Sequence, residues 1–172
     1  MPASQRYDNR TILLHWLTAG LIVVMWCLPN FINPLFPRPM RFIPISAHIV
    51  LGAALVCIYL ARIVWRLTSG TRLPAAETGV MGLAGTFTHY ALYALVAATL
   101  GIGLTYEAVR GDLIFQLVQI PSISPGNTTL RRSLAGWHEL AANAILILAG
   151  LHAAAALYHR FIRKDAVLQR ML

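Results

Sequence analysis

Four long stretches without a charged side chain constrain most strongly how this chain can fold. They cover residues 11–30, 42–61, 80–106 and 140–159, and each holds at least 20 residues. A helix needs about 20 apolar residues to cross the roughly 30 Å of hydrocarbon in a bilayer. Because lipid offers no hydrogen-bond partners, the backbone groups of such a segment must be satisfied within a helix or a closed barrel. The stretches lack the alternation of barrel strands, so we predict four transmembrane helices.

The composition excludes the other classes of protein. Of the 172 residues, 58% are hydrophobic and 12% are charged, about half the charged fraction of a soluble domain. A disordered chain is excluded as well, because disordered chains are poor in apolar residues. The two cysteines, Cys27 and Cys57, are too few for a disulfide framework. We expect the lipid bilayer as a partner and no nucleic acid, and the oligomeric state stays open.

Residues 1–172 are expected to form a single all-α domain, an integral membrane four-helix bundle. Its helices are expected at about 10–30, 43–67, 80–106 and 133–161. No small-x-small cleavage site follows the first apolar run, so that run is interpreted as a retained helix and not a signal peptide. Nine of the 14 basic residues lie on the side that holds both termini. Basic residues prefer the cytoplasmic side, which predicts that both termini are cytoplasmic.

The connections carry local signals of their own. Five prolines in residues 29–44 predict an extended, stiff loop. Residues 112–120 form an amphipathic piece that is expected to lie along the membrane interface, and a turn-rich segment after it leads to a helix start near Ser133. The connection 68–79 is short, which makes the second and third helices antiparallel neighbours.

Histidines within the spans point to the chemistry. Ionisable residues at that depth are costly and are usually functional. His138 and His152 are 14 residues apart, which is about 3.9 helical turns and roughly 21 Å along one face. In an up-and-down bundle, His48 lies at the depth of His138, and His15 lies at the depth of His152. Facing histidines at one depth can ligate a haem from both sides, so we predict two haems stacked across the bilayer.

The alternative for each histidine is a plain hydrogen bond to a neighbouring helix. For His89 and His159 that interpretation competes on equal terms with ligation. His89 also competes with His15 as ligand of the haem near the termini, because both lie on that side of the membrane. Zinc fits less well, since Cys27 and Cys57 are isolated from other ligands.

The predicted haems have a defined character. No C-x-x-C-H attachment motif occurs in the chain, so the two haems are expected to be b type and held without a covalent bond. Iron with two histidine ligands has no vacant position. The sites are therefore expected to carry single electrons and not to bind oxygen as a ligand.

Several short segments resemble the bacterial cytochrome b561 family of small dihaem membrane proteins. The matching segments span nearly the whole chain; they are Leu14-His-Trp-Leu, Ala61-Arg-Ile-Val-Trp-Arg-Leu, Gly136-Trp-His-Glu-Leu and Gly150-Leu-His-Ala-Ala-Ala-Ala-Leu, followed by Tyr158-His. The resemblance implies haem iron ligation by His15, His48, His138 and His152. It also implies a location in the bacterial inner membrane and electron transfer from superoxide at the periplasmic face to ubiquinone.

Charged residues at the two ends fit these implications. On the periplasmic side, basic residues would steer an anionic substrate, although contact with phospholipid headgroups explains each of them as well; they are Arg38, Arg41, Arg110, Arg131 and Arg132. On the cytoplasmic side, His159 or Arg10 is a candidate contact for a quinone. Arg62 and Arg66, and alternatively Arg10, are candidates to pair with haem propionates. Ordinary positive-inside residues are the competing interpretation.

Two functions compete for this chain, and a structural role is a third possibility. The first is an oxidoreductase that oxidises superoxide and reduces ubiquinone without a partner. The second is a cytochrome b subunit that links a partner dehydrogenase or a periplasmic donor to the quinone pool, with docking at residues 34–42 or 112–120. A haem-free structural membrane protein would show no reduced b-type spectrum.

Overall fold

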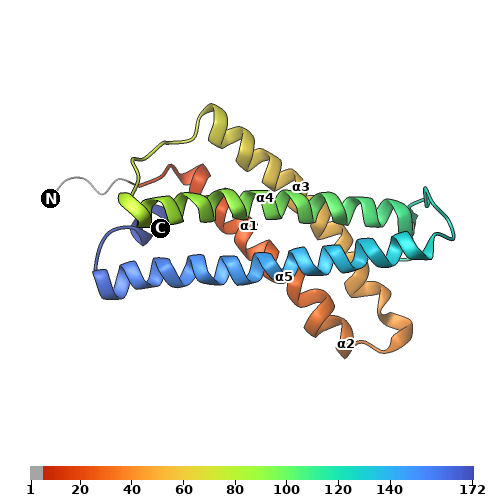
Figure 1. The fold of residues 1–172 in the computed structure, drawn as a ribbon. Coiled ribbons are helices and arrows are strands. Elements are labelled where there is room, and N and C mark those ends of the chain that lie inside the picture. Colours follow the sequence, from red (N-terminus) through yellow and green to blue (C-terminus); the bar gives the residue numbers. More distant parts are fainter. Residues whose placement is uncertain (1–5) are drawn as a thin grey trace.

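The computed structural model describes residues 6–172, and it is built almost entirely from helices (Figure 1). The long helices are α1 (Asn9–Cys27), α3 (Phe42–Thr68), α4 (Gly79–Arg110) and α5 (Thr128–Tyr158). Within the described residues, four helical segments are long and apolar enough to cross a membrane. The predicted all-α membrane four-helix bundle is thus confirmed.

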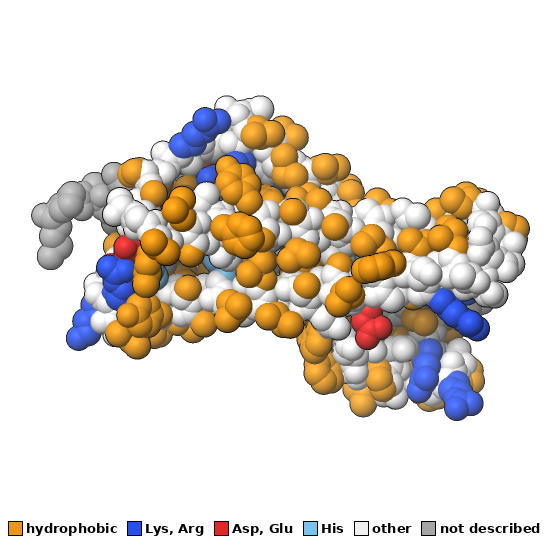
Figure 2. Space-filling model, viewed as in Figure 1, with side chains coloured by type: hydrophobic (Ala, Val, Ile, Leu, Met, Phe, Trp, Pro, Cys, Tyr) orange, Lys and Arg blue, Asp and Glu red, His pale blue; other side chains and the backbone are white. Residues whose placement is uncertain are grey.

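The sides of the bundle are apolar and its charges lie mainly toward the ends. On the face drawn in Figure 2, hydrophobic side chains cover the long sides of the helices, and most Lys and Arg side chains lie near the two ends. Large apolar side chains such as Leu83, Ile147 and Leu151 are more than 60% exposed. An apolar surface of this extent suits hydrocarbon and not water.

The four helices associate as two antiparallel pairs. α1 packs along α3, and α4 packs along α5, whereas contacts between the two pairs are sparse. In Figure 1 the α1–α3 pair crosses the α4–α5 pair obliquely. A small cluster of Tyr59, Val96 and Ile145 joins the pairs, and the Tyr59 hydroxyl donates a hydrogen bond of 2.7 Å to the Tyr93 carbonyl.

We call the end of the bundle that holds residues 6–8, the connection 69–78 and residues 164–172 the terminal end. The opposite end, with α2 (Asn33–Leu35) and the strands β1 (Leu113–Ile114) and β2 (Val118–Gln119), is the hairpin end. Figure 1 shows both chain ends on one side and the hairpin on the other.

Residues 29–44 differ from the sequence-based prediction of an extended loop. α1 continues through a π-helical turn (Leu28–Ile32) into α2, and a 3-10 turn (Arg38–Met40) follows. Each of these short helices carries a proline in its first two positions. The prolines at 29 and 34 therefore lie within a continuing helical segment, and Pro39 lies in the first turn of a separate short helix, where a proline is well tolerated.

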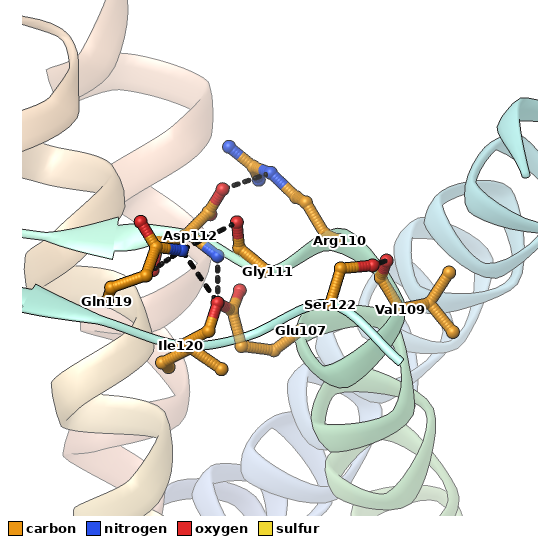
Figure 3. Close-up of polar contacts among 8 residues, drawn as sticks. All are labelled: Glu107, Val109, Arg110, Gly111, Asp112, Gln119, Ile120 and Ser122. Atoms are coloured by element: carbon orange, nitrogen blue, oxygen red, sulfur yellow. Dashed lines mark hydrogen bonds and ion pairs between the residues drawn. The ribbon is translucent and has the colours of Figure 1, made fainter. Parts of the chain in front are cut away.

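Residues 112–120 form a two-stranded antiparallel hairpin, in which Leu113 pairs with Gln119 and Ile114 with Val118. Phe115 and Gln116 turn the chain with positive φ angles of 47° and 62°. Gly111 ends α4 with a φ of 68°, and a Cβ at that position would lie 2.6 Å from the Ser122 backbone nitrogen. Figure 3 shows how the Gln119 amide donates to carbonyls around this turn.

The last long helix begins earlier than the predicted start near Ser133. α5 starts at Thr128 because the Asn127 side chain accepts a hydrogen bond of 3.0 Å from the Leu130 backbone nitrogen, which is the usual role of an N-cap asparagine. Beyond Tyr158 the chain continues as a π-helical segment, His159–Arg163.

Asp8 organises the terminal end. Its carboxylate caps α1 by accepting hydrogen bonds from the Thr11 nitrogen and hydroxyl, and it also accepts from the Trp65 ring and the Thr71 nitrogen. Burial alone would raise the pKa of Asp8, but these hydrogen bonds outweigh it and hold the pKa well below its usual range. One carboxylate thus joins the start of α1 to the end of α3 and to the loop after it.

Asp8→Ala is expected to destabilise the folded protein by about 1–2 kcal/mol, because it removes the N-cap and the partner of Trp65. The folded pKa is depressed, so this contribution is present above the ordinary carboxyl pKa of about 3.9 and is lost as the pH falls below it. The apparent midpoint of thermal unfolding in detergent, measured for both proteins at pH 7 and below pH 4, checks this.

Asn9→Ala is the matched control for this prediction, because Asn9 is the exposed neighbour and its side chain contacts only Arg6 among these groups. A control variant that unfolds as early as Asp8→Ala at pH 7 would contradict the role of the carboxylate.

Candidate functional site

Four histidines form two facing pairs inside the bundle. The ring centres of His48 on α3 and His138 on α5 are 6.1 Å apart. Those of His15 on α1 and His152 on α5 are 6.5 Å apart. α5 is helical throughout residues 138–152, so its two histidines stand roughly 21 Å apart along the axis. The structure therefore brings together both predicted pairs, at two separate depths.

Each pair spans the divide between the two helix pairs. In each histidine pair, one ring comes from the α1–α3 helix pair and the other comes from α5 of the α4–α5 helix pair. None of the described large side chains is more than 98% buried. The space between the helix pairs is therefore not filled by a dense side-chain core.

The ring separations fit an iron between the imidazoles. A ring nitrogen binds a metal at about 2 Å, and the ring centre lies about 1 Å behind it, so two opposed imidazole ligands have centres about 6 Å apart. The pairs at 6.1 Å and 6.5 Å match this value. The centres of His89 and His152 are only 5.1 Å apart, which is too short for two opposed ligands.

The pair nearer the hairpin end has ring nitrogens in a state suited to ligation. Nδ1 of His138 lies 3.2 Å from the Thr99 carbonyl oxygen; a carbonyl accepts only, so Nδ1 donates and Nε2 keeps a free lone pair. Second partners of this kind orient metal-binding histidines. Nδ1 of His48 is buried and has no hydrogen-bond partner among the described residues.

Gly103 on α4 makes room for the His138 ring. A Cβ at position 103 would lie 2.9 Å from Cε1 of His138. Real Cβ atoms do not approach this closely, so any larger residue would displace the imidazole. The sequence contains no local signal for this contact, since Gly103 and His138 meet only through the packing of α4 on α5.

The pair nearer the terminal end is arranged differently. Nη2 of Arg62 lies 3.0 Å from Nδ1 of His15, and because arginine can only donate, Nδ1 of His15 accepts. A neutral His15 then carries its proton on Nε2. Ligation through Nε2 therefore requires the Arg62 guanidinium to leave Nδ1. The guanidinium also lies 5.0 Å from the centre of the Tyr93 ring.

The other predicted arginines of this end do not contact the histidine pairs. Arg10 stacks over Trp65 at 4.7 Å, and Arg66 lies 5.9 Å from the Tyr7 ring centre. Of the three candidates for haem propionates, Arg62 is thus the one whose side chain reaches a histidine of the pairs.

A pocket of about 350 Å³ at the hairpin end gathers three of the predicted steering arginines. Its lining combines them with polar and apolar side chains; it consists of Arg38, Arg41, Phe42, Ile45, Ser46, Arg110, Asp112, Leu113 and Gln116. Arg131 and Arg132, which were predicted to act with them, do not line this pocket. Nε of Arg110 pairs with Asp112 at 2.8 Å (Figure 3), so Arg38 and Arg41 supply the uncompensated charge.

His159 is paired with acidic residues at the terminal end. Its Nδ1 lies 2.6 Å from Oδ2 of Asp165 and 4.0 Å from Oε1 of Glu77, and Glu77 binds Nη1 of Arg163 at 2.6 Å. The sequence-based reasoning missed Glu77 and Asp165. The chain has only six acidic residues, and this small number was the signal in the sequence that could have singled out Glu77 and Asp165.

A four-helix membrane bundle with facing histidines at two depths is typical of membrane cytochromes b. Comparison with known proteins agrees with this class. The model of the family described as Prokaryotic cytochrome b561 matches residues 6–172. The chain therefore belongs to the prokaryotic cytochrome b561 family.

Related proteins match over their whole length. The chain is 30% identical to a protein of Yersinia pestis named probable superoxide oxidase CybB, over 98% of this chain and 96% of that protein. It is 28% identical to cytochrome b562 of Cereibacter sphaeroides, over 96% and 94%, and 25% identical to cytochrome b561 homolog 1 of Escherichia coli, over 97% of both. The family makes this chain an electron-transfer protein of a bacterial membrane and implies haem b as its cofactor.

Proposed function

We propose that this protein transfers single electrons from superoxide, oxidised at the hairpin end, to ubiquinone, reduced at the terminal end. The observation that carries the proposal is the two histidine pairs at two depths of one bundle, with ring centres 6.1 Å and 6.5 Å apart. Each pair holds one haem b, His48 with His138 and His15 with His152. When bound, each haem supplies an iron that takes up and releases one electron.

The choice of His15 over His89 rests on distance and position. His15 reaches His152 from α1, across the divide between the helix pairs, at the separation that an intervening iron requires. His89 lies on α4, which packs directly along α5, and its ring is in near contact with that of His152. His89 is also exposed, whereas His15 is half-buried.

Arg62 has two partners in this proposal. Without a carboxylate nearby, its guanidinium donates to His15. A haem propionate is a stronger acceptor, because charge-assisted pairs of arginine with carboxylate exceed hydrogen bonds to a neutral ring. With a propionate within its reach, Arg62 would leave Nδ1 of His15, and the ring could then carry its proton on Nδ1 and offer Nε2 to the iron.

The substrate roles of the two ends follow from their charge. At the hairpin end, Arg38 and Arg41 attract an anion to a pocket whose wall includes Ser46, two residues before His48. Two superoxide anions give two electrons and two molecules of oxygen; ubiquinone takes the two electrons and two protons to become ubiquinol. One relative of this chain carries the name probable superoxide oxidase.

Orientation completes the proposal. In this proposal both termini lie in the cytoplasm and the hairpin end lies in the periplasm of a bacterial inner membrane. The larger share of basic residues at the terminal end supports this orientation. His159 at the terminal end is the proposed contact for the quinone, and Arg10 is a second candidate.

Haem content of histidine variants tests the ligand assignment. His15→Ala and His48→Ala are each expected to lose one of two haems, because each removes one of the two protein ligands of an iron, whereas His89→Ala keeps both. Haem per polypeptide and the reduced-minus-oxidised spectrum of the purified proteins measure this. Loss of a haem in His89→Ala but not in His15→Ala would reverse the assignment.

Gly103→Ala tests the haem site at His138 without removing a ligand. The added methyl group collides with the His138 ring, so we expect loss or spectral change of one haem. Gly101→Ala is the matched control on the same helix, because a Cβ there has no atom within 4 Å. Equal spectra for both variants would contradict the proposed site.

Superoxide-driven haem reduction tests the activity and the role of the arginines. In a stopped-flow experiment, a superoxide source is expected to reduce the haems of the purified protein. Added ubiquinone is then expected to reoxidise them. Arg38→Gln should slow the reduction by about 2–10-fold at low salt, since steering by charge raises association rates. High salt should remove most of the difference.

Arg132→Gln is the control, because Arg132 is equally charged but does not line the pocket. If superoxide does not reduce the haems above the uncatalysed rate, the alternative donor, a partner protein of the respiratory chain, replaces it.

A further inference from the structure

His159, the proposed contact for the quinone, forms a connected polar cluster with Asp165 and Glu77. His159 follows the last residue of α5, Asp165 lies in the turn after the π-helical segment, and Glu77 precedes α4. The His159 side chain is 13% exposed, that of Glu77 25% and that of Asp165 31%. The two acidic side chains are thus more exposed than the histidine that they contact.

The hydrogen bonds fix the chemistry of the His159 ring. Its Nδ1 donates to the Asp165 carboxylate at 2.6 Å, so Nε2 is the nitrogen left to exchange a proton with a ligand. The Val167 nitrogen donates to the other Asp165 oxygen, and the Asp165 nitrogen donates to the His159 carbonyl. The carboxylate is therefore held in place against the ring.

Asp165 is suited to remain an anion there. Burial would raise its pKa, but the hydrogen bond from His159 and the bond from the Val167 nitrogen outweigh it, and the His159 and Arg163 charges add to them, so the pKa lies below its usual value. The other titratable or charged groups facing His159 among the described residues are Tyr158, Glu77 and Arg163.

Position links this cluster to the haem pairs. His159 follows His152 by seven residues, which is about two turns, so both lie on nearly the same face of the helix and about 10 Å apart along the axis. Glu77 also lines a groove of about 440 Å³ along the start of α4. Thr78, Gly79 and Gly82 also line this groove.

We propose that His159 delivers protons to the quinone and that Asp165 positions its ring, with Glu77 as the link to water, so that the protons of ubiquinol come from the aqueous phase at the terminal end. The inference rests on the proposed reduction of quinone at this end. Each quinone takes two electrons, which arrive singly through the protein, and two protons, which His159 passes on from Nε2 and regains from water. No further oxidant or reductant is needed.

The test uses the purified holoprotein with its haems reduced by dithionite, so that it does not depend on superoxide. Oxidation of the haems by a short-chain ubiquinone is followed by stopped flow between pH 5.5 and 9. Asp165→Asn is expected to slow oxidation about 10-fold near neutral pH and to change the pH dependence of the rate, because the ring that passes the proton is no longer held by a carboxylate. Haem content is expected to stay unchanged, and Asp165→Glu should restore most of the rate.

Arg170→Ala controls for loosening of the C-terminal segment. Nη1 of Arg170 donates to the Pro74 carbonyl at 2.8 Å and does not contact His159, so this variant should keep the wild-type pH profile. If Asp165→Asn and Arg170→Ala give the same pH profile, Asp165 has only a structural role and the inference is overturned.

Sidedness gives an independent readout. In proteoliposomes whose terminal ends face inward, a pH-sensitive dye sealed inside should report alkalinisation as quinone is reduced. Alkalinisation outside would overturn the inference but leave the electron path intact. Failure of quinone to oxidise the reduced wild-type haems would instead refute the proposed quinone reaction itself.

Discussion

The arrangement of this protein depends on α5, which faces two different helices at two depths. His138 meets His48 of α3, and His152 meets His15 of α1, so a single helix serves both levels of the bundle. Polar rings within an apolar span are costly unless they are paired or bound. Because His138 and His152 are 14 residues apart on one helix, α3 must bring His48 to the level of the first ring and α1 must bring His15 to the level of the second. The sparse contact between the helix pairs agrees with an interior organised around these rings.

The two ends of the bundle differ in their charged groups. The hairpin end presents a pocket with the uncompensated guanidinium groups of Arg38 and Arg41, which suits a small anion. The terminal end combines basic residues with Asp8 and the cluster of Glu77, His159 and Asp165. The guanidinium groups at the hairpin end can attract an anion, whereas the histidine and carboxylates at the terminal end can exchange protons with a neutral acceptor.

Contacts between elements account for the features that sequence reasoning missed. Asp165 lies six residues beyond His159, but Glu77 reaches the same ring from the connection before α4, more than 80 residues away. The missing side chain at Gly103 matters only because α4 packs closely on α5, which brings the His138 ring against this position. Similarly, five prolines predicted an extended loop at residues 29–44, whereas their positions in the first turns make them compatible with short helices. Composition does not show at which position of a turn a proline will lie.

What the sequence determined by itself is the class of fold and the depth of the histidines. Uncharged runs of 20 residues or more that lack the alternation of barrel strands must form helices in lipid, and the rise of the helix converts spacing into depth. The tertiary structure decided which rings face one another, because His15 and His89 share a depth and differ only in their helix and in their distance from His152. It also decided that Arg38, Arg41 and Arg110, but not Arg131 and Arg132, line one pocket. Lateral packing depends on contacts between distant segments, and the one-dimensional pattern of a membrane helix does not encode them.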